Sequence, residues 1–156
     1  MNPRSDTSAQ GYFTYAEAYA ACARTLIQSP PEIPHDDAPM RMLAFHAIEL
    51  YLKSFLRNLG HTTGELAAKP FAHDLAALAN AARGHLTLRA DDLVLLNDRR
   101  LWSSAMQTRY LAPTAPDKLL VDPALLCALA DRVRTALLAH PASKDQIIVW
   151  GEGVNP

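Results

Sequence analysis

The chain has 156 residues, of which 49% are hydrophobic and 20% charged, a size and balance typical of one globular domain with one core. Its formal net charge is -1, which excludes a protein that binds nucleic acid through its overall charge. Two cysteines without paired spacing predict neither a disulfide framework nor a zinc cluster. Since no stretch resembles a signal peptide or a membrane span, we expect a cytoplasmic protein.

Proline and glycine divide the chain into segments with helical periodicity. The first predicted helix runs from Tyr15 to Gln28, with Thr14 or its neighbour as N-cap. The second and most apolar one runs from Met40 to Leu59 and ends at Gly60. Its apolar residues cover most of its circumference, so we expect it to be the central helix.

Three shorter helices are predicted beyond Gly60. One runs from His73 to Arg83, and the next begins behind Asp91 and Asp92 and extends toward Tyr110.

The last predicted helix has Asp122 as N-cap and Pro123 at its first position, and it ends at Pro141. The segment Ile147–Trp150 reads as a possible short strand, which cannot form a sheet alone. We therefore expect an all-α fold, an up-and-down bundle of four to five helices over residues 14–140, with tails at 1–13 and 141–156.

The central helix carries one polar stripe. His46, Glu49, Lys53 and Arg57 fall within roughly 80° of one another at helical spacing. An intrahelical ladder of ion pairs accounts for them without any function. Alternatively, His46, Glu49 and Lys53 point into a groove, where a lysine can hold a phosphate and a histidine can act as acid or base.

His46 and Glu49, together with the later pair His73 and Asp74, supply the ligand types that a metal in a helical bundle uses. The order His-x-x-Glu is the reverse of the Glu-x-x-His found in dimetal bundles, so we expect no metal and no other cofactor. The competing interpretation is that His73 caps its helix or hydrogen-bonds to Glu49 and joins two helices.

Arginines lie beside aromatic residues in the fourth predicted helix, as Arg99-Arg100 near Trp102 and as Arg109-Tyr110. Such pairs can stack on bases and bind phosphates, although a solvated helix face explains them as well. The sequence contains no glycine-rich phosphate loop and no Gly-x-Ser-x-Gly motif.

Two blocks resemble the HEPN family of small helical bundles: RMLAFHAIELYLKSFLRNLG at 41–60 and FAHDLAALA at 71–79. Together with QTRYL at 107–111, the resemblance spans about residues 14–138. It implies a bundle of four or five helices, often a homodimer. Members occur in bacterial defence and toxin systems, sometimes encoded beside a minimal nucleotidyltransferase.

Many members of that family cut RNA without a metal, using an arginine and a histidine separated by four to six residues before the last helix. In the matching stretch here, NDRRLWSSAM at 97–106, no histidine follows the arginines. Two other pairs fit the spacing by count, Arg41 with His46 and Arg134 with His140. Arg41 and His46 lie about 140° apart on a regular helix, so they cannot face one phosphate together.

The sequence therefore predicts a non-catalytic, HEPN-like bundle that binds a nucleotide, RNA or a partner protein and forms a homodimer. The predicted binding residues are His46, Glu49, Lys53, His73, Asp74, Arg109 and Tyr110. The alternative is a metal-independent ribonuclease toxin that uses one of the two atypical pairs, with the histidine as acid or base and the arginine on the phosphate. In a third reading, the polar stripe only fixes how the helices pack.

Overall fold

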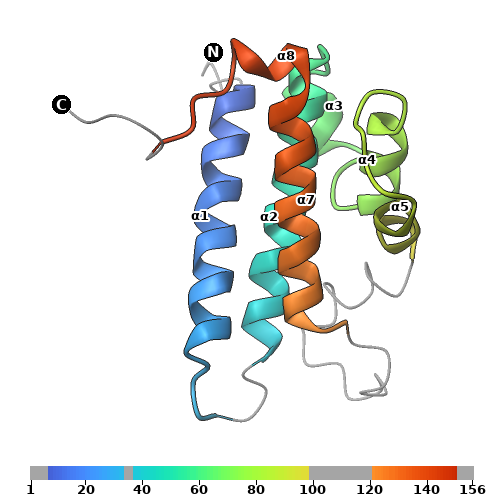
Figure 1. The fold of residues 1–156 in the computed structure, drawn as a ribbon. Coiled ribbons are helices and arrows are strands. Elements are labelled where there is room, and N and C mark those ends of the chain that lie inside the picture. The colour runs from blue at the N-terminus through green and yellow to red at the C-terminus, as the bar shows by residue number, and fades with distance from the viewer. Residues whose placement is uncertain (1–6, 34–36, 99–120, 151–156) are drawn as a thin grey trace, which may run out of the picture.

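A computed structural model of the chain describes residues 7–33, 37–98 and 121–150. Within these ranges all regular structure is helical, which confirms the all-α class. Three long helices, α1 (Ala9–Gln28), α2 (Asp37–Asn58) and α7 (Pro123–Ala139), lie side by side, with α1 running opposite to the other two (Figure 1). The short helices α4 (Leu75–Ala82) and α5 (Ala90–Asn97) lie to one side.

Helix α2 is the central element, as predicted. It packs against α1, α4, α7 and the short α8 (Pro141–Lys144). Its buried side chains lie on nearly all sides of the helix, and they include Ile48, Tyr51, Leu52 and Phe55. A helix that is apolar around its circumference is stable in water only when neighbours cover it, and here they do.

Helix α1 lies along α2 through a row of small side chains. Ala16, Ala20 and Ala23 are fully buried, and Phe13 fills the space near the start of the helix. The spacing of these residues places them on one face, and small side chains let the two helices approach closely.

Helix α1 begins at Ala9, six residues before the predicted start, within the segment that was predicted to be a tail. Its N-cap is Ser8, whose hydroxyl oxygen accepts a hydrogen bond from the Gly11 amide at 3.0 Å. The prediction placed the cap at Thr14, which lies inside the helix. Gly11 disfavours a helix interior, but it is tolerated in the first turn because its amide is capped there.

Two short helices were not predicted. In α3 (Thr63–Ala67) the side chains of Thr62 and Glu65 form a capping box. In α8 the ring of His140 caps the helix, and Pro141 occupies its first position. Pro141 therefore ends α7 and also begins the next helix, which is a favourable place for proline.

The later predicted helices are shorter in the structure. Helix α4 begins after its N-cap Asp74. Helix α5 begins at Ala90, so Asp91 and Asp92 lie in its first turn and not before it as predicted, and it ends at Asn97. Residues 99–110 of the predicted continuation lie outside the described residues. Asp122 caps α7 as predicted. The segment Ile147–Trp150 was expected as a possible strand and forms none.

No helix in the ranges given above is both long enough and apolar enough to span a membrane.

Candidate functional site

Four of the predicted binding residues meet where α2 faces the start of α4. Glu49 accepts a hydrogen bond from the Lys53 ammonium, with 2.7 Å between Oε1 and Nζ. The His73 ring nitrogen Nδ1 lies 3.2 Å from the same oxygen, and His46 Nδ1 lies 3.8 Å from Glu49 Oε2. The expected contact between His73 and Glu49 is therefore present, and it links α2 to the residue that precedes the N-cap of α4.

The two charged residues at the centre of this cluster are internal, whereas the His73 side chain is half exposed. The side chains of Glu49 and Lys53 are only 5% and 8% exposed. Lys53 also donates to the carbonyl oxygen of Ala72, 2.6 Å from Nζ, so its charge is held by two protein acceptors. A buried ammonium ion that is already paired in this way has little capacity left for a ligand phosphate.

The surroundings of Glu49 keep its carboxylate ionised. Burial by itself would raise its pKa, but contacts with His46 and Lys53 and the charges of Lys53 and His73 outweigh burial and lower the pKa from 4.5 to about 2. The carboxylate is therefore a permanent negative charge at neutral pH, and it balances the buried ammonium of Lys53.

Asp74 has a different role: its carboxylate caps α4 by accepting from the Ala77 amide at 3.0 Å. The ring of His46, besides its contact with Glu49, packs edge-on against Tyr19 of α1, with 4.4 Å between the ring centroids. Arg109 and Tyr110 lie outside the described residues. A role of these residues in binding stays a prediction.

The two atypical Arg/His pairs are engaged in other contacts. Arg41 forms an ion pair with Asp37 in the first turn of α2. Arg134 donates from Nε and Nη2 to the carboxylate of Glu17 in α1, at 2.6 and 3.2 Å. The same carboxylate accepts from the Tyr51 hydroxyl at 2.5 Å, and burial together with this bond raises the pKa of Tyr51. These contacts tie α1, α2 and α7 together.

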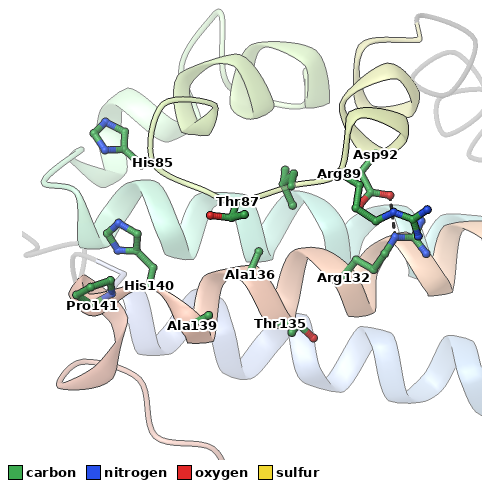
Figure 2. A pocket seen from close by; sticks show the side chains of 11 residues that line it. His85, Thr87, Arg89, Asp92, Arg132, Thr135, Ala136, Ala139, His140 and Pro141 are labelled. Atoms are coloured by element: carbon green, nitrogen blue, oxygen red, sulfur yellow. Dashed lines mark hydrogen bonds and ion pairs between the residues drawn. The ribbon is translucent and has the colours of Figure 1, made fainter.

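A cavity of about 450 Å³ lies elsewhere, between α7 and the segment that connects α4 to α5. Figure 2 shows its titratable side chains at two ends, with Thr87 and Thr135 between them. His85 and His140 lie at one end, and Arg89, Asp92 and Arg132 at the other. The residues that line it are His85, Thr87, Leu88, Arg89, Asp92, Arg132, Thr135, Ala136, Ala139, His140 and Pro141.

An ion pair fixes the arginine end of the cavity. Arg132 donates from Nε to Asp92 Oδ1 at 2.7 Å, and the Asp92 side chain is 2% exposed. Because this bond uses Nε, the two terminal nitrogens of the guanidinium remain for another acceptor. Two arginines and one aspartate line this end, and Arg89 also lies 3.7 Å from the exposed carboxylate of Asp91. The two guanidinium groups suit an anion.

The histidine end has a defined donor. His140 Nδ1 accepts a hydrogen bond from the Ala142 amide at 3.2 Å, so the neutral ring carries its proton on Nε2. The ring also packs edge-on against Phe55, with 5.0 Å between the centroids. These two contacts orient the ring, and its Nε2–H group is a donor rather than a base.

Sequence reasoning missed most of this cavity. Of its polar residues only His140 was considered as a site residue, and it was paired with Arg134, which does not line the cavity. Asp92 was interpreted only as one of two aspartates behind which a helix begins. Periodicity gives no signal that residues 85–92 meet residues 132–141, because that contact joins elements far apart in the chain.

Among the described residues no three His, Cys, Asp or Glu side chains are grouped so that they could hold a metal ion. Comparisons of the chain with protein families, with curated proteins and with solved structures gave no match.

Proposed function

We propose that this protein is a non-catalytic binding module that holds a nucleotide in the cavity between α7 and the α4–α5 connection. The observation that carries the proposal is the polarised lining of the cavity, with two arginines at one end and two histidines at the other (Figure 2). Its volume of about 450 Å³ falls in the range of small-molecule sites.

Each part of a nucleotide has a complementary group in this cavity. The guanidinium groups of Arg89 and Arg132 suit a phosphate, which they can bind through paired N–H donors. Leu88 and Ala136 supply apolar lining, and Figure 2 shows Ala136 with Thr87 between the two ends. The imidazole rings of His85 and His140 can stack on a base or donate to it.

The cavity supports this function better than the Glu49–Lys53 cluster does. The polar groups of that cluster are turned toward one another, and Lys53 has two protein acceptors. In the cavity, by contrast, the Arg89 side chain is 68% exposed, and its ion pair with Asp91 is long at 3.7 Å.

Calorimetric titration with the four ribonucleoside 5′-monophosphates tests the proposal. We expect at least one to bind with a stoichiometry of one per chain, and Arg89→Ala to weaken it about tenfold through the loss of one charge-assisted contact. Arg83→Ala is the matched control, because Arg83 is an exposed arginine in the same connection that does not line the cavity. Binding that is equally strong in both variants would reject the cavity as the site.

We further propose that the bundle is HEPN-like, homodimeric and cytoplasmic. The resemblance of residues 41–60 and 71–79 supports this proposal, and so does the packing of several helices around α2. A nucleotide in this cavity fits a role in a bacterial defence or toxin system with a minimal nucleotidyltransferase as partner. Light scattering during size exclusion would give twice the monomer mass for a dimer.

The ribonuclease alternative is tested on the same sample. Incubation with RNA in EDTA should leave the RNA intact, since Arg134 is bound to Glu17 and His140 has its Nδ1 lone pair occupied. Cleavage that disappears in His140→Ala or His46→Ala would overturn the non-catalytic assignment.

A further inference from the structure

The carboxylate of Asp92 is only half satisfied. Its Oδ1 accepts from Arg132, but Oδ2 is buried and has no hydrogen-bond partner among the residues that the structure describes. The side chain is 2% exposed, and the residue lines the cavity. A buried carboxylate oxygen without a donor is unusual in folded proteins, because burial removes the water that would otherwise bind it.

A hydrogen-bond donor of a ligand can satisfy this unpaired oxygen. An ionised carboxylate only accepts, so phosphate and carboxylate groups of a ligand cannot satisfy it. A hydroxyl or an amino group can. The donor must lie close to the arginine end, because Asp92 lies there with Arg89 and Arg132 (Figure 2).

In a nucleotide whose phosphate binds the two arginines, the ribose hydroxyls are the donors nearest to that phosphate. The base, which carries the amino groups, then extends along the apolar wall toward His85 and His140 (Figure 2). On this geometry the sugar, and not the base, is the part of the ligand that meets Asp92.

We propose that Asp92 accepts a hydrogen bond from a ribose hydroxyl and makes the cavity selective for ribonucleotides over deoxyribonucleotides. This inference rests on the proposed function and adds the group of the ligand that is recognised. Recognition through a buried acceptor is a strong discriminator, since an analogue without the donor leaves the carboxylate oxygen unpaired.

Access to Oδ2 requires a movement of the residues around it, because this atom is buried. Arg89 and Arg132 lie next to Asp92, and their side chains are 68% and 33% exposed. On this proposal the lining next to Asp92 rearranges when the phosphate binds, while Arg132 keeps its bond to Oδ1 and the sugar hydroxyl reaches Oδ2.

The experiment compares sugar analogues of whichever ribonucleoside 5′-monophosphate binds most tightly. Calorimetry would measure the ribonucleotide, its 2′-deoxy and 3′-deoxy forms, and the 2′-O-methyl form, which keeps the oxygen but cannot donate. We expect at least one deoxy form to bind tenfold or more weakly, and the 2′-O-methyl form to be as weak as the 2′-deoxy form if the 2′-hydroxyl is the donor.

The variant Asp92→Asn tests the assignment to this residue. It keeps the size of the side chain, and it should reduce the preference for the ribonucleotide to less than threefold. Asp145→Asn, at an exposed aspartate outside the cavity, is the control and should keep the full preference. The ratio of two ligands is the readout because a purely structural effect would weaken both equally.

Three results would overturn the inference. Equal binding of ribo and deoxy forms by the unaltered protein would remove sugar recognition while leaving nucleotide binding in place. A preference that persists in a folded Asp92→Asn variant would assign it to another residue. If Asp92→Asn fails to fold, the analogue series on the unaltered protein still decides whether the cavity distinguishes ribonucleotides from deoxyribonucleotides. Failure of every nucleotide to bind would reject the proposed function together with the inference.

Discussion

Glu49 shows how a single buried charge can hold two helices in register. Its carboxylate is bonded to Lys53 within α2 and to His73 ahead of α4. Replacing both members of such a pair by apolar residues is often harmless, whereas removing one leaves the other charge buried without a partner.

Glu49→Gln should therefore destabilise the protein by about 3–5 kcal/mol, the cost typical of breaking a buried ion pair on one side. Urea unfolding followed by circular dichroism would measure it. Glu32→Gln is the control, because Glu32 is exposed in the loop after α1, and it should change the free energy of unfolding by less than about 0.5 kcal/mol. Equal free energies of unfolding for the two variants would show that the ion pair of Glu49 with Lys53 contributes nothing to stability.

The same carboxylate predicts a pH dependence. Since the pKa of Glu49 in the folded protein is lowered from 4.5 to about 2, its stabilising contribution is complete above pH 4.5 and is lost as the pH falls toward 2. The free energy of unfolding should fall over that window, and it should fall less steeply in Glu49→Gln. Parallel curves for the two proteins would contradict the lowered pKa.

At the scale of the helices, the end of α2 depends on one backbone conformation. Gly60 has φ of 102°, in the left-handed region, and its amide donates to the carbonyl of Arg57. Glycine adopts this conformation without the steric cost that a Cβ atom brings.

Gly60→Ala should lower the free energy of unfolding by about 1 kcal/mol, although a Cβ there would meet no atom within 4 Å. Gly84→Ala is the matched control, since Gly84 has equally open surroundings without a positive φ. It should be neutral or stabilising by up to about 1 kcal/mol, because alanine restricts the unfolded chain. Thermal or urea unfolding would measure both variants. A loss of the same size in the free energy of unfolding of both would exclude backbone strain at Gly60 as the cause.

The sequence predicts elements better where the cause is local. Asp122 with Pro123 predicts the start of α7, and Gly60 predicts the end of α2. Each prediction depends only on adjacent residues, and the structure confirms both. The Thr62 and Glu65 pair is a capping box visible in the sequence, and reading it would have found α3.

The sequence did not predict most of the contacts between residues that lie far apart in the chain. The contact of His73 with Glu49 was predicted only as the competing interpretation to a metal site, from the residue types and not from any periodicity. The ion pair of Asp92 with Arg132 was not predicted, because 40 residues separate them and no period connects α5 with α7. The candidate cavity consists almost entirely of such contacts, so only the folded arrangement reveals it.

At the scale of the whole molecule, the start of α1 is joined to the segment after α8. The Gln10 side chain accepts from the Ile148 amide at 2.6 Å and donates to the Ile148 carbonyl at 3.1 Å. This pair of bonds holds the segment as a neighbouring strand would, while the adjacent Ile147 side chain is buried in the core.

Gln10→Ala should release that segment without unfolding the bundle. Hydrogen exchange of the Ile148 amide should accelerate by at least tenfold, because its acceptor is removed. The Ile147 amide, which donates to the Ser143 carbonyl, serves as the internal reference. Gln28→Ala, at the exposed far end of α1, should leave both amides unchanged. An unchanged Ile148 rate in Gln10→Ala would show that other contacts hold the segment.

The central position of α2 also sets the order in which the chain can complete its core during synthesis. Its contact with α1 joins neighbouring segments, but α7 ends roughly 80 residues beyond α2, which ribosomes take roughly 4–16 seconds to add. Throughout that interval the side of α2 that α7 later covers is exposed on the nascent chain. Chaperones that bind apolar helices therefore have seconds in which to engage it, and codon choice between α2 and α7 should influence the yield of folded protein.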